Sequence, residues 1–286
     1  MTNDRLGKTI IDELRLCYVA EPELLDTLSL LDFGERVTFE RFSVVRIVGQ
    51  HFQFYYTLLD VNNHKVAYLY FGRYGDESNY LWVKFENRML YNRLQLQNLM
   101  FDIQSILPIV FNNITKIDLA KDFKKNVVYA IKRLFKDSEI KTIINGRVVK
   151  DRKKVLKELM VVYQASLERI KNPSITICQA EAARNKAKGT TIQAYNKGAE
   201  LIKSDKTYIS EFYGNPKALH RLEVRLNSDE IRDYYKKQQR QQMVEDIFDE
   251  MFLTDMYYYH LGSVLRFTRG RNPVSWQDIL GIATTR

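Results

Sequence analysis

The first third of the chain alternates apolar and polar residues over short runs, a pattern that predicts strands. The alternation begins at Asp12–Val19. A helix is predicted next, because Pro22 suits a first helical turn and leucines recur behind it at helical spacing. Four runs rich in aromatic and β-branched residues follow: Phe42–Val48, His51–Leu59, Lys65–Phe71 and Tyr80–Phe85. Short turns separate these runs, so we expect an antiparallel meander, followed by a helix over Leu94–Ile109.

The remaining two thirds of the chain mix both periodicities. Three strands carry charged or hydroxyl side chains and are predicted over Ile114–Ala120, Thr190–Lys197 and Arg221–Leu226, with a shorter one over Ser174–Gln179. Asn145-Gly146 suits the tight turn of a hairpin over Thr142–Val149. Apolar residues at helical spacing predict the helices, which are Val127–Phe135, Lys153–Ile170, Asn227–Gln242 and Val244–Phe267.

This order of elements predicts an α+β fold, an antiparallel β-sheet with helices packed on one side. Strand, helix, several strands and helix occur twice, which allows the interpretation that two halves are pseudo-duplicated. We therefore expect an N-terminal α+β half over residues 1–110 and a second α+β half over 111–235. Residues 236–286 are expected to form a C-terminal helical segment.

The composition of the chain indicates which classes of binding partner are compatible with it. The chain has 286 residues, a net charge of +9, a pI near 9.3, 18 tyrosines and 15 phenylalanines. Cations for phosphates and rings for bases are compatible with nucleic acid, although many soluble proteins are equally basic. The two cysteines lack zinc-site spacing, and no secretory signal or membrane-length apolar run is visible, so we expect a cytoplasmic protein without a membrane partner.

An acidic residue in the middle of a predicted strand is unusual, because aspartate is depleted in strands. Asp118 is such a residue, and Asp122 follows four positions later. Two carboxylates at this spacing are candidate ligands for one hard cation, Mg²⁺ or Mn²⁺. The alternative is that Asp118 lies on a solvated sheet face.

A second charged strand alternates Arg221, Glu223 and Arg225 with three apolar residues. Glu223 is a candidate metal ligand, and the two arginines are candidates for phosphate contacts. The alternative is a solvated face held by cross-strand ion pairs.

Tyr195 lies near the end of its predicted strand, two residues before Lys197, and Asn196-Lys197-Gly198 predicts a turn there. A nearby cation favours the phenolate and can offset phosphate charge, so Tyr195 is a candidate nucleophile. It is equally a candidate for base stacking, and a single tyrosine among 18 is usually structural. The basic stretch before this strand contains Arg184, Lys186 and Lys188, which together with Arg225 are candidate DNA contacts.

Three of these stretches together resemble the rolling-circle replication initiation factor family, the plasmid and phage Rep initiators and related relaxases. They are Ile117-Asp118-Leu119-Ala120-Lys121-Asp122, Tyr195-Asn196-Lys197 and Arg221-Leu222-Glu223, in the family's order. Ile11–Leu16 is also similar to the family's first strand. The resemblance covers residues 10 to 235, and the sequence departs from the wider superfamily by lacking its His-hydrophobe-His metal motif.

The resemblance implies a Rep nuclease-like fold and an origin-specific DNA nickase and strand transferase. Tyr195 would form a 5′-phosphotyrosine link, with Asp118 and Glu223 holding Mg²⁺ or Mn²⁺ and Lys197, Arg221 and Arg225 offsetting charge. The implied partners are origin DNA, single-stranded or as a hairpin, and a host helicase and polymerase, while a homodimer stays open. Other tyrosines remain alternative nucleophiles, namely Tyr208, Tyr213, Tyr234 and Tyr235. A non-catalytic DNA-binding protein and a different metal-dependent nuclease remain alternative functions.

Overall fold

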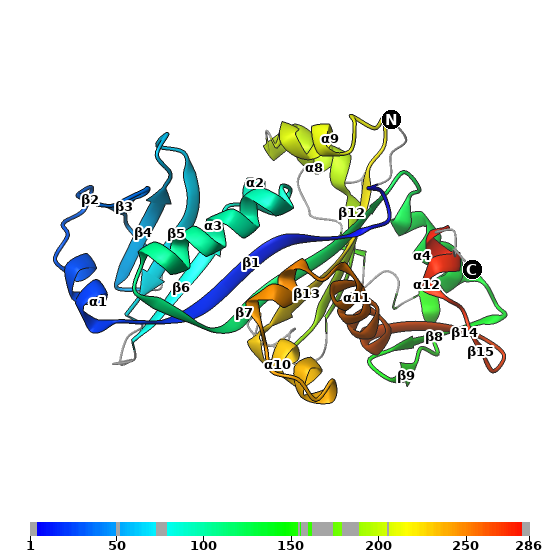
Figure 1. Cartoon of the computed structure of the whole chain (residues 1–286). Coiled ribbons are helices and arrows are strands. Elements are labelled where there is room, and N and C mark those ends of the chain that lie inside the picture. Colours follow the sequence, from blue (N-terminus) through cyan, green and yellow to red (C-terminus); the bar gives the residue numbers. More distant parts are fainter. Residues whose placement is uncertain are drawn as a thin grey trace. The chain divides into compact units, whose positions relative to one another are not determined.

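The structure is a computed structural model that describes residues 5–49, 52–72, 79–153, 155, 160–161, 174–178, 189–204 and 206–281. It is an α+β protein with antiparallel sheets, as predicted (Figure 1). The chain divides into two compact units. We call residues 11–117 with 235–248 the N-terminal unit, and residues 1–10, 118–234 and 249–286 the C-terminal unit. None of the helices in the described ranges is long and apolar enough to span a bilayer.

The N-terminal unit contains the predicted meander. Its elements are β1 (Thr9–Ala20, from Ile11 on), α1 (Pro22–Ser29), β2 (Arg36–Phe39), β3 (Phe42–Arg46), β4 (Phe54–Leu59), β5 (Lys65–Phe71), β6 (Tyr80–Phe85), α2 (Asn87–Leu90), α3 (Arg93–Ile106), the first part of β7 (Ile109–Phe123) and the 3₁₀ turn η1 (Val244–Phe248). Strands β2 to β6 pair antiparallel in chain order, and β6 pairs with β1. The strand β2 was not predicted, because its four residues are too few to show a period.

The sheet of the N-terminal unit has one apolar face and one mixed face. Leu14, Leu16, Val83 and Leu69 occupy the apolar face and are fully buried. Helix α1 packs on this side, since the hydroxyl of Tyr56 donates to the Leu28 carbonyl at 2.7 Å. The alternation seen in the sequence therefore separates core from surface, as the period of a strand requires.

The C-terminal unit contains the three strands with candidate site residues. Its elements are the end of β7, α4 (Val127–Lys136), β8 (Ile140–Ile144), β9 (Arg147–Val148), β10 (Met160–Val161), β11 (Ser174–Cys178), β12 (Thr191–Asn196), α8 (Lys197–Ser204), α9 (Thr207–Phe212), β13 (His220–Asn227), most of α10 (Ser228–Lys237), α11 (Glu250–Val264), β14 (Leu265–Arg269), β15 (Asn272–Pro273) and α12 (Trp276–Leu280). The strand order is β10-β11-β12-β13-β7, and a second sheet has the order β15-β14-β8-β9.

The two units share part of one order of elements, and the predicted duplication stays an interpretation. In the N-terminal unit, β1 and α1 precede a meander whose last strand, β6, pairs with β1. In the C-terminal unit, β7 and α4 precede strands β10 to β13, and β13 lies beside β7. In both units, the last strand of the meander thus lies next to the first strand of the unit.

Two local predictions about the C-terminal unit are tested by the structure, and a third is not. The Asn145-Gly146 hairpin is confirmed, with both residues at positive φ of 49° and 77° between β8 and β9. The turn expected at Asn196-Lys197-Gly198 is wrong, because Asn196 caps α8 by accepting from the Ala199 amide at 3.0 Å. The predicted helix Lys153–Ile170 lies mostly outside the described residues.

The helix predicted over Val244–Phe267 is also wrong at both ends. Asp249 caps α11 by accepting from the amides of Met251 and Phe252 at 2.9 and 3.0 Å, so the helix begins at Glu250. It ends at Val264, where β14 begins and pairs with β8. Residues 236–286 are therefore not entirely helical, and they are shared between the two units.

Candidate functional site

Strands β12 and β13 place Tyr195 and Glu223 on one face of the C-terminal unit. In the antiparallel register Gln193 lies opposite Glu223 and Tyr195 lies opposite Arg221. Since alternate residues share a face, Tyr195, Glu223 and Arg225 point to the same side. The intervening apolar residues of both strands are 1% exposed or less and form the other face: Ile192, Ala194, Leu222, Val224 and Leu226. Helix α11 covers that other face, since the Tyr257 hydroxyl donates to the Leu222 carbonyl at 3.1 Å.

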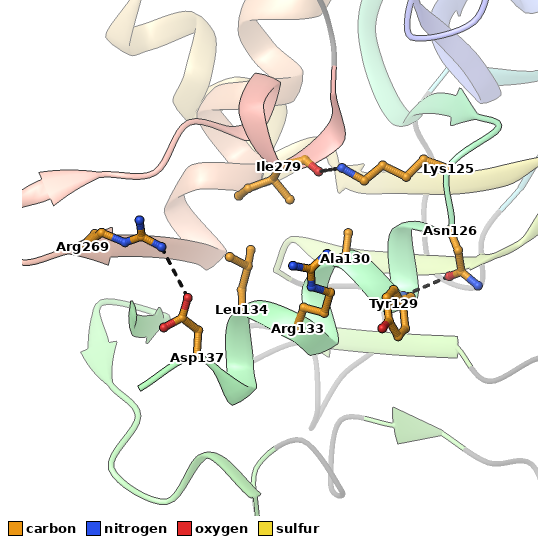
Figure 2. Close-up of a pocket in the computed structure, with 9 residues that line it drawn as sticks. All are labelled: Lys125, Asn126, Tyr129, Ala130, Arg133, Leu134, Asp137, Arg269 and Ile279. Atoms are coloured by element: carbon orange, nitrogen blue, oxygen red, sulfur yellow. Dashed lines mark hydrogen bonds and ion pairs between the residues drawn. The ribbon is translucent and has the colours of Figure 1, made fainter. Parts of the chain in front are cut away.

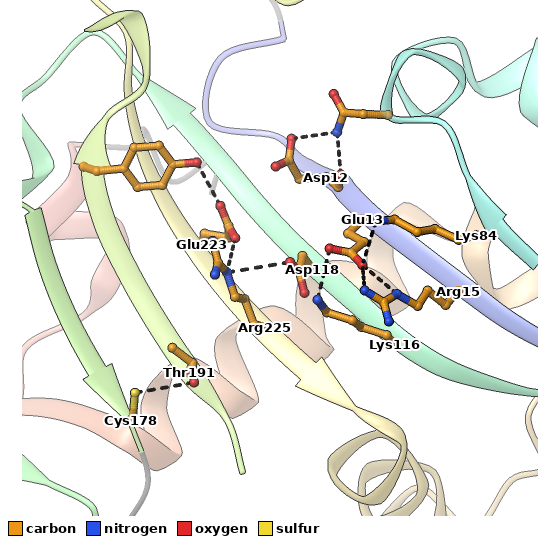
Figure 3. Close-up of polar contacts among 12 residues, drawn as sticks. Asp12, Glu13, Arg15, Lys84, Lys116, Asp118, Cys178, Thr191, Glu223 and Arg225 are labelled. Carbon is orange, nitrogen blue, oxygen red and sulfur yellow. Dashed lines mark hydrogen bonds and ion pairs between the residues drawn. The ribbon is translucent and has the colours of Figure 1, made fainter. Parts of the chain in front are cut away.

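Four polar side chains converge on the polar face, and we call them the Tyr195 cluster: Asp118, Tyr195, Glu223 and Arg225. The Tyr195 hydroxyl donates to Glu223 Oε2 at 3.0 Å, and Arg225 Nε donates to Glu223 Oε1 at 2.5 Å. Arg225 Nε is also 3.7 Å from Asp118 Oδ2, so Arg225 lies between the two carboxylates (Figure 3). Asp118, Glu223 and Tyr195 therefore lie close together on this face.

Burial and charge in the Tyr195 cluster are unequal. Glu223 and Asp118 are 1% and 4% exposed, whereas the Arg225 side chain is 43% exposed. Burial acts to lower the pKa of Arg225, but the Glu223 and Asp118 carboxylates outweigh it and hold that pKa above its usual range. The cluster thus opens to solvent on the side of its cation, where an anion such as a phosphate can approach.

Asp122 and Arg221 form a separate pair in the interior. Arg221 donates to both carboxylate oxygens of Asp122, at 2.8 and 2.6 Å, and both side chains are fully buried. A bidentate pair of this kind satisfies the aspartate on both oxygens. Asp122 was predicted to bind a metal together with Asp118, but in this arrangement it pairs with Arg221 instead.

Lys197 is also placed inside the unit. Its side chain is 1% exposed, forms an ion pair with Glu200 at 2.8 Å, and lies 5.8 Å from the centre of the Tyr195 ring. The residue is thus a neighbour of Tyr195, as the spacing in the sequence indicated, and its charge is shared with Glu200.

Two members of the Tyr195 cluster are of a type that could bind a hard divalent cation. Asp118 and Glu223 present carboxylate oxygens on neighbouring strands, and oxygens of this type are what Mg²⁺ and Mn²⁺ prefer. The guanidinium of Arg225 already brings a positive charge between these two carboxylates. Throughout the described ranges, no group of three or more His, Cys, Asp or Glu side chains comes together as metal ligands. The candidate metal site therefore consists of two protein carboxylates.

The alternative tyrosines differ from Tyr195 in their surroundings. Tyr213, Tyr234 and Tyr235 are at most 2% exposed. The Tyr234 hydroxyl donates to Asp255 at 2.6 Å, and the Tyr235 hydroxyl donates to Asp246 at 2.8 Å. Tyr208 is half-buried on α9. The predicted DNA contacts on the basic stretch, Arg184, Lys186 and Lys188, lie outside the described residues.

Two features of the C-terminal unit were missed by reasoning from sequence. Lys121, between the two aspartates of its strand, is 4% exposed and donates to the Gly7 carbonyl at 2.8 Å. Burial lowers its pKa to about 8. Only its position inside the Asp118 motif could have drawn attention to it, because a lysine in a strand normally reaches solvent.

The second missed feature is a cavity of about 290 Å³ beside α4 (Figure 2). Lys125 there donates to the Ile279 carbonyl at 2.7 Å, and Arg269 forms an ion pair with Asp137 at 3.4 Å. These contacts link the residues that flank α4 to α12 and β14. We therefore interpret the two cations as supports for packing.

No protein-family model matches the sequence, and no curated protein matches it either. A solved structure of a rolling circle replication initiator protein from Geobacillus stearothermophilus is similar in fold, with 13% sequence identity and a TM-score of 0.49. The alignment covers 96% of this chain and 95% of the other. A likeness at this level assigns neither residue roles nor an activity.

Proposed function

We propose that this chain is an endonuclease and strand transferase that initiates rolling-circle replication of DNA, with Tyr195 as its nucleophile. The observation that supports this most strongly is the hydrogen bond from the Tyr195 hydroxyl to the buried Glu223 carboxylate, at 3.0 Å. A nucleophile within hydrogen-bond reach of a base is what covalent catalysis requires. The order of the Asp118, Tyr195 and Glu223 motifs directs the choice of origin DNA as substrate, single-stranded or as a hairpin.

In the proposed reaction, the Tyr195 oxygen attacks the phosphorus of the scissile phosphodiester. Its proton passes to Glu223 Oε2, which already accepts the hydrogen bond. The bond from phosphorus to the 3′ oxygen breaks, and that oxygen leaves with the electron pair and takes up a proton. The products are a 5′-phosphotyrosine and a free 3′-hydroxyl that would prime a host polymerase. The covalent link conserves the energy of the bond for a second transfer that closes the displaced circle.

The cations have different proposed roles because their burial differs. Arg225 is the cation of the cluster with a partly exposed side chain, so it would contact the scissile phosphate. Lys197 and Arg221 are buried and form ion pairs with Glu200 and Asp122, so they would act through position and charge. Asp118 and Glu223 would hold Mg²⁺ or Mn²⁺, which when bound would polarise the scissile phosphate. The host helicase stays a prediction of the resemblance, the cytoplasmic location stays a prediction from composition, and a homodimer stays open.

The test uses a supercoiled plasmid that carries the DNA flanking this gene, incubated with Mg²⁺ or Mn²⁺. Wild-type protein should produce nicked circles with protein attached at a 5′ end. Tyr195→Phe should abolish the adduct while DNA binding is retained, because only the hydroxyl is lost. Tyr208→Phe is the matched control, since Tyr208 is a half-buried tyrosine of the same unit outside the cluster.

Each other outcome has a distinct meaning. An adduct that persists in Tyr195→Phe and disappears in Tyr208→Phe would assign the nucleophile to α9. Binding without cleavage under either metal would favour a non-catalytic DNA-binding protein. Nicks with free 5′-phosphates and no adduct would favour a different metal-dependent nuclease.

A further inference from the structure

The mixed face of the N-terminal unit carries a row of aromatic rings across neighbouring strands. Tyr55 lies opposite Tyr70, and Tyr70 lies opposite Trp82, in the register of β4, β5 and β6. The rings of these pairs are nearly parallel, at interplanar angles of 9° and 6°, with centres 5.3 and 6.2 Å apart. Phe52 packs on both Tyr70 and Trp82, at 4.5 and 5.4 Å. The rings therefore pack into one row, whose central member, Tyr70, is 4% exposed.

This face is open at its edge. Val19 lies opposite Tyr80 in the pairing of β1 with β6, and these two side chains are 42% and 38% exposed. Trp82, Tyr55 and Phe52 are half-buried. The fully buried leucines and valine of the unit lie on the other face, so the exposed ring of Tyr80 is not needed to fill that core.

Cations lie beside the rings on the same face. Arg15 lies opposite Lys84 in the register, two residues along the strand from the pair of Cys17 and Trp82 and therefore on the same face. Lys116 reaches the same place, because it donates to Glu13 at 3.0 Å (Figure 3). The side chains of Arg15, Lys84 and Lys116 are 36%, 34% and 22% exposed, so they remain accessible to an anion.

Glu13 shows how strongly positive this place is. Burial acts to raise the pKa of Glu13, but Lys116, Arg15 and Lys84 outweigh it and lower that pKa to about 2. Three cations share the one carboxylate of Glu13, so this group of side chains keeps a net positive charge next to the rings. Rings and cations on one open sheet face are the combination that binds single-stranded nucleic acid, with bases on the rings and phosphates on the cations.

We infer that this face of β4, β5, β6 and β1 binds single-stranded DNA, with bases against Tyr80 and Trp82 and phosphates at Arg15, Lys84 and Lys116. This surface shares no residue with the Tyr195 cluster, and in this proposal it takes no part in cleavage. The choice of DNA over RNA rests on the proposed function, whereas the stacking and charge arguments do not.

Trp82 provides a direct reporter of binding, because the chain has only two tryptophans. Trp276→Phe leaves Trp82 alone, and Tyr195→Phe in the same protein prevents cleavage. Titration with oligo(dT) of about 20 nucleotides, without divalent metal, should quench the Trp82 fluorescence. Tyr80→Ala should weaken binding about fivefold or more, the effect of losing one stacked base. Lys84→Gln should reduce the slope of log Kd against log salt by about 0.7.

Matched controls remove the same chemistry elsewhere in the unit. Arg88→Gln removes an exposed cation of α2, and Leu94→Ala removes an apolar side chain of α3 that is 68% exposed. Neither should change binding by more than about twofold. Absence of quenching, or equal losses in Lys84→Gln and Arg88→Gln, would overturn the inference, and tighter binding of oligo(rU) would overturn the choice of DNA. If the wild-type protein does not nick DNA but oligo(dT) still quenches the Trp82 fluorescence, the proposed cleavage is wrong and the inference of DNA binding stands.

Discussion

The pair of Asp122 and Arg221 gives the sharpest test of the C-terminal unit. Both side chains are fully buried, and two hydrogen bonds of 2.8 and 2.6 Å join them. Asp122→Asn keeps the shape of the side chain and removes its charge, so the guanidinium is left buried without its counter-charge. Removing one partner of a buried pair costs about 3–5 kcal/mol of the free energy of unfolding. That is a large share of the 5–15 kcal/mol typical of a folded domain.

Urea unfolding followed by circular dichroism measures this loss. With a slope of about 3 kcal/mol per molar urea, the midpoint should fall by about 1 to 2 M. Asp229→Asn is the matched control, because Asp229 forms an ion pair with Arg232 at 2.7 Å in which both side chains are about half exposed. Its loss should cost less than about 1 kcal/mol.

The double variant Asp122→Leu with Arg221→Met completes the test. It removes both charges, so it should be more stable than Asp122→Asn, as expected when no uncompensated charge is left inside. If Asp122→Asn costs no more than Asp229→Asn, the pair is not buried in solution and this reasoning is refuted. Arg221 would then be available to contact a phosphate directly.

Two further predictions concern pH. Glu13 has a folded-state pKa of about 2 against an ordinary 4.5, so its stabilisation of up to about 3 kcal/mol is complete above pH 4.5 and is lost as the pH falls towards 2. Glu13→Gln should therefore flatten the acid limb of urea midpoints measured from pH 6 to 2, and an unchanged limb would contradict the assignment. Lys121 has a folded-state pKa of about 8 against an ordinary 10.5, so stability should rise as the pH increases from 8 to 10.5. Lys121→Met should therefore raise the free energy of unfolding by on the order of 2 kcal/mol at pH 7. This stabilisation should be smaller at pH 10.5. If the variant is instead less stable at pH 7, the hydrogen bond from Lys121 to the Gly7 carbonyl outweighs the cost of burying its charge.

The local sequence pattern was sufficient to predict most helices and strands, but it did not predict where several of them begin or end. The meander from β3 to β6 followed from runs of aromatic and β-branched residues, and the β8–β9 hairpin followed from Asn145-Gly146. The start of α8 was missed because Asn196 serves both turns and helix caps, and only the amide of Ala199 decides between them. The end of α11 was missed because β14 is defined by its pairing with β8, which lies far away in the sequence.

The sequence by itself determined which side of each strand is polar. The alternation around Asp118, Tyr195 and Glu223 is a property of neighbouring residues, and the period of a strand turns it directly into two faces. It also determined the chain order of the strands that carry these three side chains. The rings and cations of the N-terminal unit were likewise visible as residue types, without a surface to join them.

Only the tertiary structure decided which of the polar and charged side chains pair with one another. β13 lies between β12 and β7, so Glu223 receives the Tyr195 hydroxyl while Arg225 spans Glu223 and Asp118. The same register directs Arg221 to Asp122, 99 positions away in the chain, and so separates Asp122 from the other two carboxylates. Partners at such separations are set by strand register and burial, and a shift of one residue would turn every one of these side chains to the opposite face.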